Sequence, residues 1–284
     1  MSSPPRRLPA RGLARLLHQL ASIAVALVFF VPLLWVAGFS LRQTGLPPPT
    51  TIEWLPRPLV WSNYARLFQI VPLGWYILNS LMVVALAVPA TLVVASWAGF
   101  AMAQLPERAR RRLSALAILL LMVPMASLWL TRYVLFTYLG LIDTIWPLIA
   151  PALMGSSPFF VLLFYWTFRR IPSELFESAR LDGAGALTIW AKIAMPLARP
   201  TIVVVTVLAF SLYWSDYVSP LLYLKSESRY TLPVGLALLQ QMDRTSWPLL
   251  MAGAVVITAP VVLLFLLVQR YFWPEGRQGG LSGR

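Results

Sequence analysis

Long stretches without a charged residue alternate with short polar segments along this chain. Residues 16–41 and 67–106 hold no Asp, Glu, Lys or Arg, and three further stretches of this kind follow before residue 270. A helix needs about 20 apolar residues to cross the hydrocarbon of a bilayer. The pattern therefore predicts an all-α integral membrane protein with six transmembrane helices, near residues 18–41, 80–104, 114–136, 147–168, 201–222 and 249–271.

Two of these stretches need a choice between readings. The stretch 67–106 is long enough for two crossings, but Pro72, Gly74 and the pair Asn79–Ser80 make its first part typical of an interfacial approach segment. The first stretch follows four arginines, as the core of a signal peptide would. It exceeds the roughly 7–15 residues of such a core, and no A-x-A cleavage site follows, so we expect a retained helix.

Basic residues predict the orientation of the six helices. Sixteen Lys and Arg fall on the side that carries both termini, and six fall on the opposite side. Because cytoplasmic loops carry the excess of Lys and Arg, both termini are expected in the cytoplasm. The expected organisation is a basic N-terminus (1–17), a six-helix transmembrane domain (18–272) and a cytoplasmic tail (273–284).

Composition supports the membrane assignment and removes several classes of chemistry. Hydrophobic residues make up 59% of the chain and charged residues 12%, against roughly 45–50% and 25% in soluble domains. The net charge of +13 does not indicate nucleic-acid binding, because the basic residues lie at the ends of apolar stretches. With no cysteine and one histidine, His18, we expect neither thiolate catalysis nor a Cys or His metal site.

The loop expected between the fourth and fifth helices, residues 169–200, is too long to be only a connection. Pro172 suits the first turn of a short helix, and Asp182–Gly183 with Gly185 is a stop-and-turn signal. A second short helix is expected from Ala186 to Pro196. Glu174, Glu177 and Asp182 give the first helix an acidic side. An amphipathic hairpin resting on lipid headgroups is the alternative, but acidic residues are poor ligands for an anionic leaflet.

This loop resembles the EAA loop of ABC importer permeases. Glu177-Ser178-Ala179 is followed by Asp182-Gly183-Ala184 and then by Ile193 and Met195-Pro196-Leu197, with Ser178 in place of the first alanine of the motif. Other segments resemble the second permease of the maltose-type, carbohydrate-import branch: Trp61-Ser62-Asn63-Tyr64, Asn79-Ser80, Trp214-Ser215-Asp216, and Gln269-Arg270-Tyr271-Phe272 with Gly279-Gly280. Ser215 and the tail after Gly280 depart from that branch.

The resemblance implies a transport subunit of a bacterial-type inner membrane, with no catalytic residue and no cofactor of its own. ATP and Mg would be bound by a separate ATPase, since neither Lys192 nor Lys225 follows a phosphate-binding glycine loop. The implied partners are a second permease subunit, two copies of the ATPase and an extracytoplasmic solute-binding protein. The residues implied in ATPase coupling are Glu177, Ser178, Ala179, Asp182, Gly183 and Ala184.

Asp216 is exceptional because it interrupts an apolar stretch expected to lie in the membrane. A carboxylate in the middle of a span costs about 2.5–3.5 kcal/mol on insertion scales, and such residues usually face the bundle interior or water. Together with Tyr213, Trp214 and Tyr217 it would suit a path for a hydroxylated solute. Two structural roles stay open: Asp216 lies near the outer interface, or it pairs with Arg132 of the third span.

Two other functions compete with carbohydrate import. A permease of the same kind would carry a non-sugar solute such as glycerol phosphate, a peptide or a polyamine. An integral-membrane enzyme acting on lipid-linked substrates would need clustered carboxylates, histidines or a metal site at a membrane boundary. Only Glu174, Glu177 and Asp182 cluster, on a solvent-side loop without histidine, which disfavours the enzyme.

Overall fold

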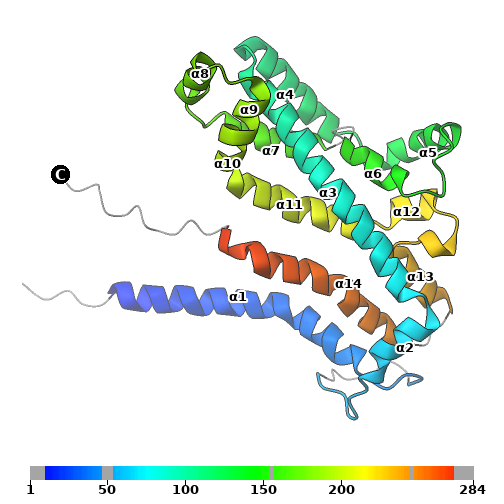
Figure 1. The fold of residues 1–284 in the computed structure, drawn as a ribbon. Coiled ribbons are helices and arrows are strands. Elements are labelled where there is room, and N and C mark those ends of the chain that lie inside the picture. Colours follow the sequence, from blue (N-terminus) through cyan, green and yellow to red (C-terminus); the bar gives the residue numbers. More distant parts are fainter. Residues whose placement is uncertain (1–9, 47–53, 154–156, 243–245, 272–284) are drawn as a thin grey trace, which may run out of the picture. The chain divides into compact units, whose positions relative to one another are not determined.

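The computed structural model describes residues 10–46, 54–153, 157–242 and 246–271, and every regular element in these ranges is helical (Figure 1). The elements are α1 (Ala10–Ser40), α2 (Ser62–Ile70), α3 (Leu73–Gln104), α4 (Glu107–Leu121), η1 (Met125–Leu128), α5 (Trp129–Tyr138), α6 (Trp146–Leu153), α7 (Pro158–Phe168), α8 (Ser173–Leu181), α9 (Ala186–Ile189), η2 (Trp190–Ala194), α10 (Met195–Leu197), α11 (Arg199–Trp214), α12 (Val218–Tyr223), η3 (Glu227–Arg229), α13 (Leu232–Met242), α14 (Trp247–Val268) and η4 (Gln269–Tyr271).

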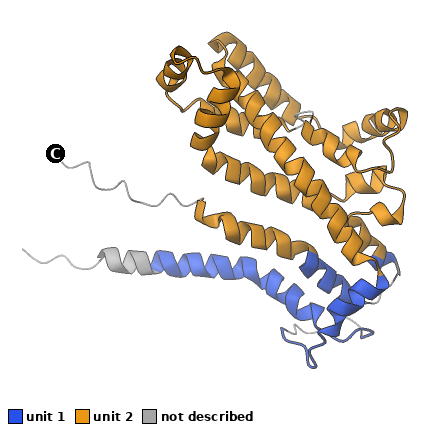
Figure 2. Cartoon of the chain, viewed as in Figure 1, with its two compact units in different colours: residues 1–70, 239–256 blue, residues 71–238, 257–284 orange. Residues whose placement is uncertain are grey.

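The chain forms two compact units (Figure 2). The first comprises residues 1–70 and 239–256 and holds α1 and α2. The second comprises residues 71–238 and 257–284 and holds α3 to α12. Both sites described below lie within the second unit.

Four segments are long and apolar enough to cross a membrane without a sharp bend: Leu17–Ser40, Leu73–Gln104, Trp146–Phe168 and Trp247–Tyr271. The third of these contains the three undescribed residues 154–156 between α6 and α7. Two further pairs of helices are long and apolar enough only when the two members are taken together, and each pair is sharply bent. The bend is 89° between Glu107–Leu121 and Met125–Tyr138, and 84° between Ala186–Leu197 and Arg199–Trp214. The expected all-α membrane protein is thus confirmed, with four to six candidate spans.

The expected boundaries of the second, third and fifth spans were wrong, and the fifth is described with the functional site. The second does not begin near residue 80, because α3 is already helical at Leu73 and places Asn79 and Ser80 inside the helix. The third, expected to be continuous over 114–136, is broken after Leu121. Pro124 supplies the physical reason for this break, since it has no N–H to donate and disfavours a helical conformation at the residue before it.

Helix α3 is the central element of the second unit and packs against α6, α7 and α11. It packs tightly on α7 at Gly99, where an added Cβ would lie 2.8 Å from both Phe164 Cβ and Tyr165 N. The absence of a side chain lets the two backbones come together there. Helices α8 to α10 gather near the carboxyl end of α3, and η3 contacts α3, so this helix joins the two regions described next.

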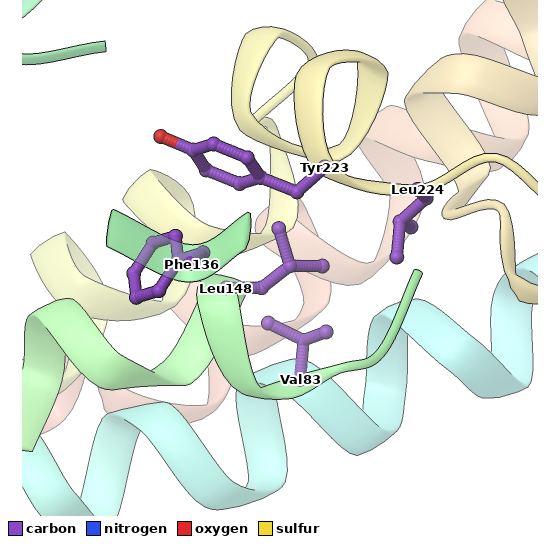
Figure 3. Packing of buried hydrophobic residues seen from close by; sticks show 5 residues of the cluster. All are labelled: Val83, Phe136, Leu148, Tyr223 and Leu224. Carbon is purple, nitrogen blue, oxygen red and sulfur yellow. The ribbon is translucent and has the colours of Figure 1, made fainter. Parts of the chain in front are cut away.

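A buried apolar cluster holds the amino-terminal half of α3 to three other helices (Figure 3). The rings of Phe136 and Tyr223 meet edge to face, with centroids 5.3 Å apart. Val83, Leu148 and Leu224 complete the cluster beside them. Because these residues come from α3, α5, α6 and the end of α12, the cluster fixes the short helices against the long one.

Candidate coupling and translocation sites

The loop 169–200 folds as the two short helices that its sequence predicts. Helix α8 begins after Pro172 and ends at a turn in which Gly183 has a φ of +80°. The Gly183 N–H donates to Arg180 O at 3.0 Å and the Ala184 N–H to Ala179 O at 2.9 Å. This is the hydrogen-bond pattern of a Schellman motif, which satisfies the last carbonyls of a helix and requires a left-handed residue at the position of Gly183. We call residues 172–198 the elbow.

We expected the second helix of the elbow to end at Pro196, but it continues to Leu197. It passes the proline by a π-helical turn over Trp190–Ala194, in which the Met195 N–H bonds to Trp190 O. Wider turns of this kind rearrange the backbone hydrogen bonds of a helix, which accommodates a residue without an N–H. The second helix of the elbow is therefore continuous from Ala186 to Leu197, near its junction with α11.

One face of the elbow is fixed to α3 by aromatic residues. Phe176 is buried and meets Phe100 edge to face, with ring centroids 5.9 Å apart. Trp190 lies edge-on to Trp97 at 5.1 Å and donates its Nε1–H to Ser96 Oγ at 3.3 Å. Such aromatic pairs contribute about 0.5–1.5 kcal/mol beyond the area that they bury. These contacts hold the elbow to the long helix.

The opposite face of the elbow is open. Glu177, Ser178, Asp182 and Gly183 are exposed, whereas Ala179 and Ala184 are half-buried. The sequence analysis did not single out Leu181, although it is 89% exposed at the end of α8. Helical spacing would have found it, because a residue five positions after the buried Phe176 points away from α3. The open face thus combines two carboxylates with an exposed leucine.

The fifth expected span, 201–222, is not one helix. Helix α11 ends at Trp214, residues 215–217 are not helical, and α12 begins at Val218. Asp216 therefore does not lie in mid-helix. Its Oδ1 accepts a hydrogen bond from the Ser219 N–H at 3.1 Å, which caps the amino-terminal end of α12. None of the ion pairs among the described residues joins Asp216 to Arg132.

The four residues expected near a translocation path differ in their exposure. Tyr213 shares a hydrogen bond of 3.2 Å with Thr91 Oγ1 of α3. Trp214 is 1% exposed and donates its Nε1–H to Ile257 O at 2.7 Å. Tyr217 is 38% exposed and Asp216 is half-buried. In this conformation Trp214 is packed inside the protein next to the helix break, whereas Asp216 and Tyr217 keep solvent-accessible surface.

A model of the family described as "Binding-protein-dependent transport system inner membrane component" matches residues 91–277. The chain belongs to this family. The permease is 30% identical over 279 residues to the arabinooligosaccharides transport system permease protein of Halalkalibacterium halodurans, covering 96% of the chain and 99% of that protein. It is 31% identical over 269 residues to the galactooligosaccharides transport system permease protein of Bacillus subtilis, covering 93% of each. Like these relatives it is a multi-pass protein of the cytoplasmic membrane and a transport subunit, not an enzyme.

The fold of the permease matches a solved structure of a bacterial ABC transporter involved in the import of the acidic polysaccharide alginate. The match has a TM-score of 0.73 at 21% identity and covers 95% of this chain and all of the other. A second structure, of an alginate ABC transporter in complex with a periplasmic protein bound to an alginate pentasaccharide, matches with a TM-score of 0.62 at 14% identity and covers 92% and 97%. These likenesses establish a shared fold.

The Asn79–Ser80 pair of the permease holds a loop. Asn79 Nδ2 donates to Ser228 O at 2.9 Å and to Tyr230 O at 3.0 Å, and Ser80 Oγ accepts from the Leu232 N–H at 2.8 Å. Nearby, Tyr76 donates to Glu227 Oε1 at 2.9 Å. The pair therefore fixes the segment 225–232, and we call this set of contacts the loop clamp.

Asp143 completes the loop clamp and was missed by the sequence analysis. Its Oδ1 accepts from the N–H groups of Lys225 and Ser226, both at 2.9 Å, while Oδ2 accepts from the Ser226 hydroxyl. The Ser226 hydroxyl and these N–H groups, helped by Arg229, lower the pKa of Asp143 to about 2. An acidic residue in a short, otherwise apolar loop was the signal that could have found it.

The Trp61–Tyr64 segment of the permease closes the end of α1. Asn63 is buried and its Nδ2 donates to Ser40 O and Arg42 O, both at 2.8 Å. Tyr64 shares a hydrogen bond of 2.8 Å with Ser40 Oγ. These bonds satisfy carbonyls at the helix end, so the segment has a structural role. Of the closing motif, Gln269–Tyr271 forms η4, while Phe272 and Gly279–Gly280 lie outside the described residues.

Among the described residues no group of three or more His, Cys, Asp or Glu side chains could hold a metal ion.

Proposed function

We propose that this permease carries a carbohydrate or a related polyhydroxylated solute across the membrane by alternating access. The support comes from two relatives that the chain matches over nearly their whole length. They are named for the transport of arabinooligosaccharides and galactooligosaccharides. Accessible aromatic and carboxylate side chains at the α11–α12 break, Tyr217 and Asp216, suit stacking on and hydrogen bonding to a sugar. Tyr213 and Trp214 hold this break in place.

The proposed topology has six spans with both termini cytoplasmic: the four unbroken segments, the bent pair Glu107–Leu121 and Met125–Tyr138, and α11 together with α12. Sixteen basic residues on the terminal side against six on the other support this orientation. A cytoplasmic N-terminus (1–17), the transmembrane permease domain (18–272) and a cytoplasmic tail (273–284) follow from it. The elbow would then project into the cytoplasm, and the loop clamp would lie on the outer side.

The elbow is proposed to couple transport to a separate ATPase, which would bind ATP and Mg²⁺. The observation that carries this proposal is its two-faced construction: aromatic contacts to α3 on one side, and Glu177, Asp182 and Leu181 open on the other. A partner groove with basic and apolar groups would complement that face. The proposed contact residues are Glu177, Ser178, Ala179, Asp182, Gly183 and Ala184. The complete assembly would contain a second permease, two ATPase copies and a solute-binding protein.

A charge reversal on the open face tests the coupling. Glu177→Lys should leave insertion intact but lower binding-protein-stimulated ATP hydrolysis and uptake, measured with the purified complex in liposomes. Glu107→Lys is the matched control, because it makes the same charge change on an exposed residue outside the elbow. Full uptake by the Glu177→Lys complex would contradict the coupling role. The solute class is tested with a panel of oligosaccharides. Each is added with the binding protein, and the stimulation of ATP hydrolysis is measured.

A further inference from the structure

A pocket of about 270 Å³ lies between the elbow and the carboxyl-terminal part of α3. Its walls include Trp97, Phe100 and Ala101 of α3 and Ile189 of α9, and its polar groups are Gln104 and Arg180. This volume approaches the lower end of small-molecule sites, roughly 300 Å³. The pocket lies on the side of the elbow that faces α3 and includes Ala184 among its lining residues, whereas the coupling residues Glu177 and Asp182 are on the open face.

The pocket carries a cation that the protein does not neutralise. Arg180 NH2 donates to the neutral amide oxygen of Gln104 at 2.5 Å. The ion pairs among the described residues are Arg111–Glu107 and Arg229–Asp143, and Arg180 takes part in neither. An anion beside the Arg180 guanidinium would therefore gain a charge-assisted hydrogen bond without displacing a carboxylate.

The depth of the pocket points to the source of that anion. Helix α3 has 32 residues, about 48 Å at 1.5 Å per residue, whereas the hydrocarbon core is about 30 Å thick. Helix α3 is therefore long enough for its last two turns, residues 97–104, to lie at the level of the headgroups. Trp97 is 40% exposed there, as is typical of an aromatic residue at a membrane interface.

We infer that this pocket binds an acidic phospholipid of the cytoplasmic leaflet, with its phosphate at Arg180 and its glycerol and first acyl carbons along Trp97 and Ala101. Such a lipid would fill the space between the elbow and α3 and stiffen the link between them. The inference rests on the proposed cytoplasmic placement of the elbow. It does not require that the elbow contact an ATPase.

Native mass spectrometry of the purified complex tests the site. The complex is released from nanodiscs of phosphatidylcholine with or without phosphatidylglycerol, and retained phosphatidylglycerol is counted. Arg180→Gln should lower retention about fivefold, corresponding to the roughly 1 kcal/mol of one basic residue near a membrane surface. Ala101→Trp should fill the pocket and have the same effect with the charge kept. Lys192→Gln is the matched control, since it removes an exposed charge of the elbow outside the pocket.

Each outcome decides between the lipid and its competitors. Equal retention by the wild type, Arg180→Gln and Ala101→Trp would overturn the site, as would an equal loss with Lys192→Gln. If inorganic phosphate added to the nanodiscs that contain phosphatidylglycerol displaced this lipid from the wild type, the ligand would be a soluble anion and the lipid assignment would fail. If Ala101→Cys cross-linked to a partner subunit, the occupant would be a protein and the lipid assignment would likewise fail. The result of the Glu177→Lys coupling test does not change the number of retained lipids. Each of the two proposals can therefore be refuted without refuting the other.

Discussion

Phe176 of the elbow meets Phe100 of α3 edge to face, with the ring planes at 81° and Phe176 buried. The contact joins the helix with the open acidic face to the long central helix. Under the proposed coupling, a push on α8 would reach α3 through this contact.

Removing this ring should loosen the elbow. Phe176→Ala deletes a buried aromatic side chain, which costs about 3–5 kcal/mol in well-packed sites. We expect a lower melting temperature and ATP hydrolysis that no longer drives uptake, measured on the reconstituted complex. Leu175→Ala, at an exposed position next to it, should retain coupled uptake. Coupled transport at the normal rate in Phe176→Ala would refute this role of the contact.

Gly99 should not tolerate even one added carbon. An alanine Cβ there would lie 2.8 Å from Phe164 Cβ and 2.9 Å from Val161 O, so α3 and α7 would have to separate. Overpacking of this kind costs about 1–3 kcal/mol. Thermal unfolding in nanodiscs should show Gly99→Ala melting below the wild type. Gly74→Ala, in the same helix with no atom within 4 Å, should melt like the wild type.

Gly183 is required for its backbone conformation and not for space. Nothing lies within 4 Å of a Cβ built there, but φ is +80°, where a side chain costs roughly 1–2 kcal/mol. Gly183→Ala should weaken the coupling of ATP hydrolysis to uptake, and Gly183→Asn should restore much of it because asparagine tolerates this region. Gly185→Ala is the control, since φ is −72° there. Equal coupling in all three variants would contradict the prediction.

The loop clamp should weaken in acid. The pKa of Asp143 falls from 3.8 to about 2 on folding, so its contribution to stability is present above about pH 4 and is lost as the pH falls toward 2. Asp143→Asn should melt below the wild type at neutral pH, and the difference should shrink as the pH approaches 2. The substituted asparagine tolerates the left-handed backbone of this position, where φ is 61°. A melting difference that stayed constant down to pH 2 would argue against the carboxylate.

Local signals predicted the elbow well. Pro172 and Gly183 determine where α8 begins and ends, and both act through their own backbone geometry. The breaks at residues 122–124 and 215–217 were not predicted, because an apolar stretch has the same hydropathy whether its helix is continuous or not. The π turn before Pro196 was also not predicted, because hydropathy is the same for a π turn and an α-helical turn.

Contacts between distant segments were beyond the sequence. Asn79 and Ser228 are 149 residues apart, and nothing near either residue indicates the other. The same holds for Trp190 and Ser96, 94 residues apart. The sequence thus singled out the exposed Glu177, Ser178, Asp182 and Gly183, but neither Leu181 nor the aromatic and polar contacts that hold the other face of the elbow to α3.

The interruption at residues 215–217 has a consequence for hydration. Peptide groups that leave a helix at membrane depth are tolerated only beside protein or water, never against acyl chains. Asp216 and Tyr217 lie in this interruption and keep some accessible surface. In the proposed topology, that side of α11 and α12 stays turned from the lipid throughout a transport cycle, so spin labels near Asp216 should report a wet environment even when no sugar is present.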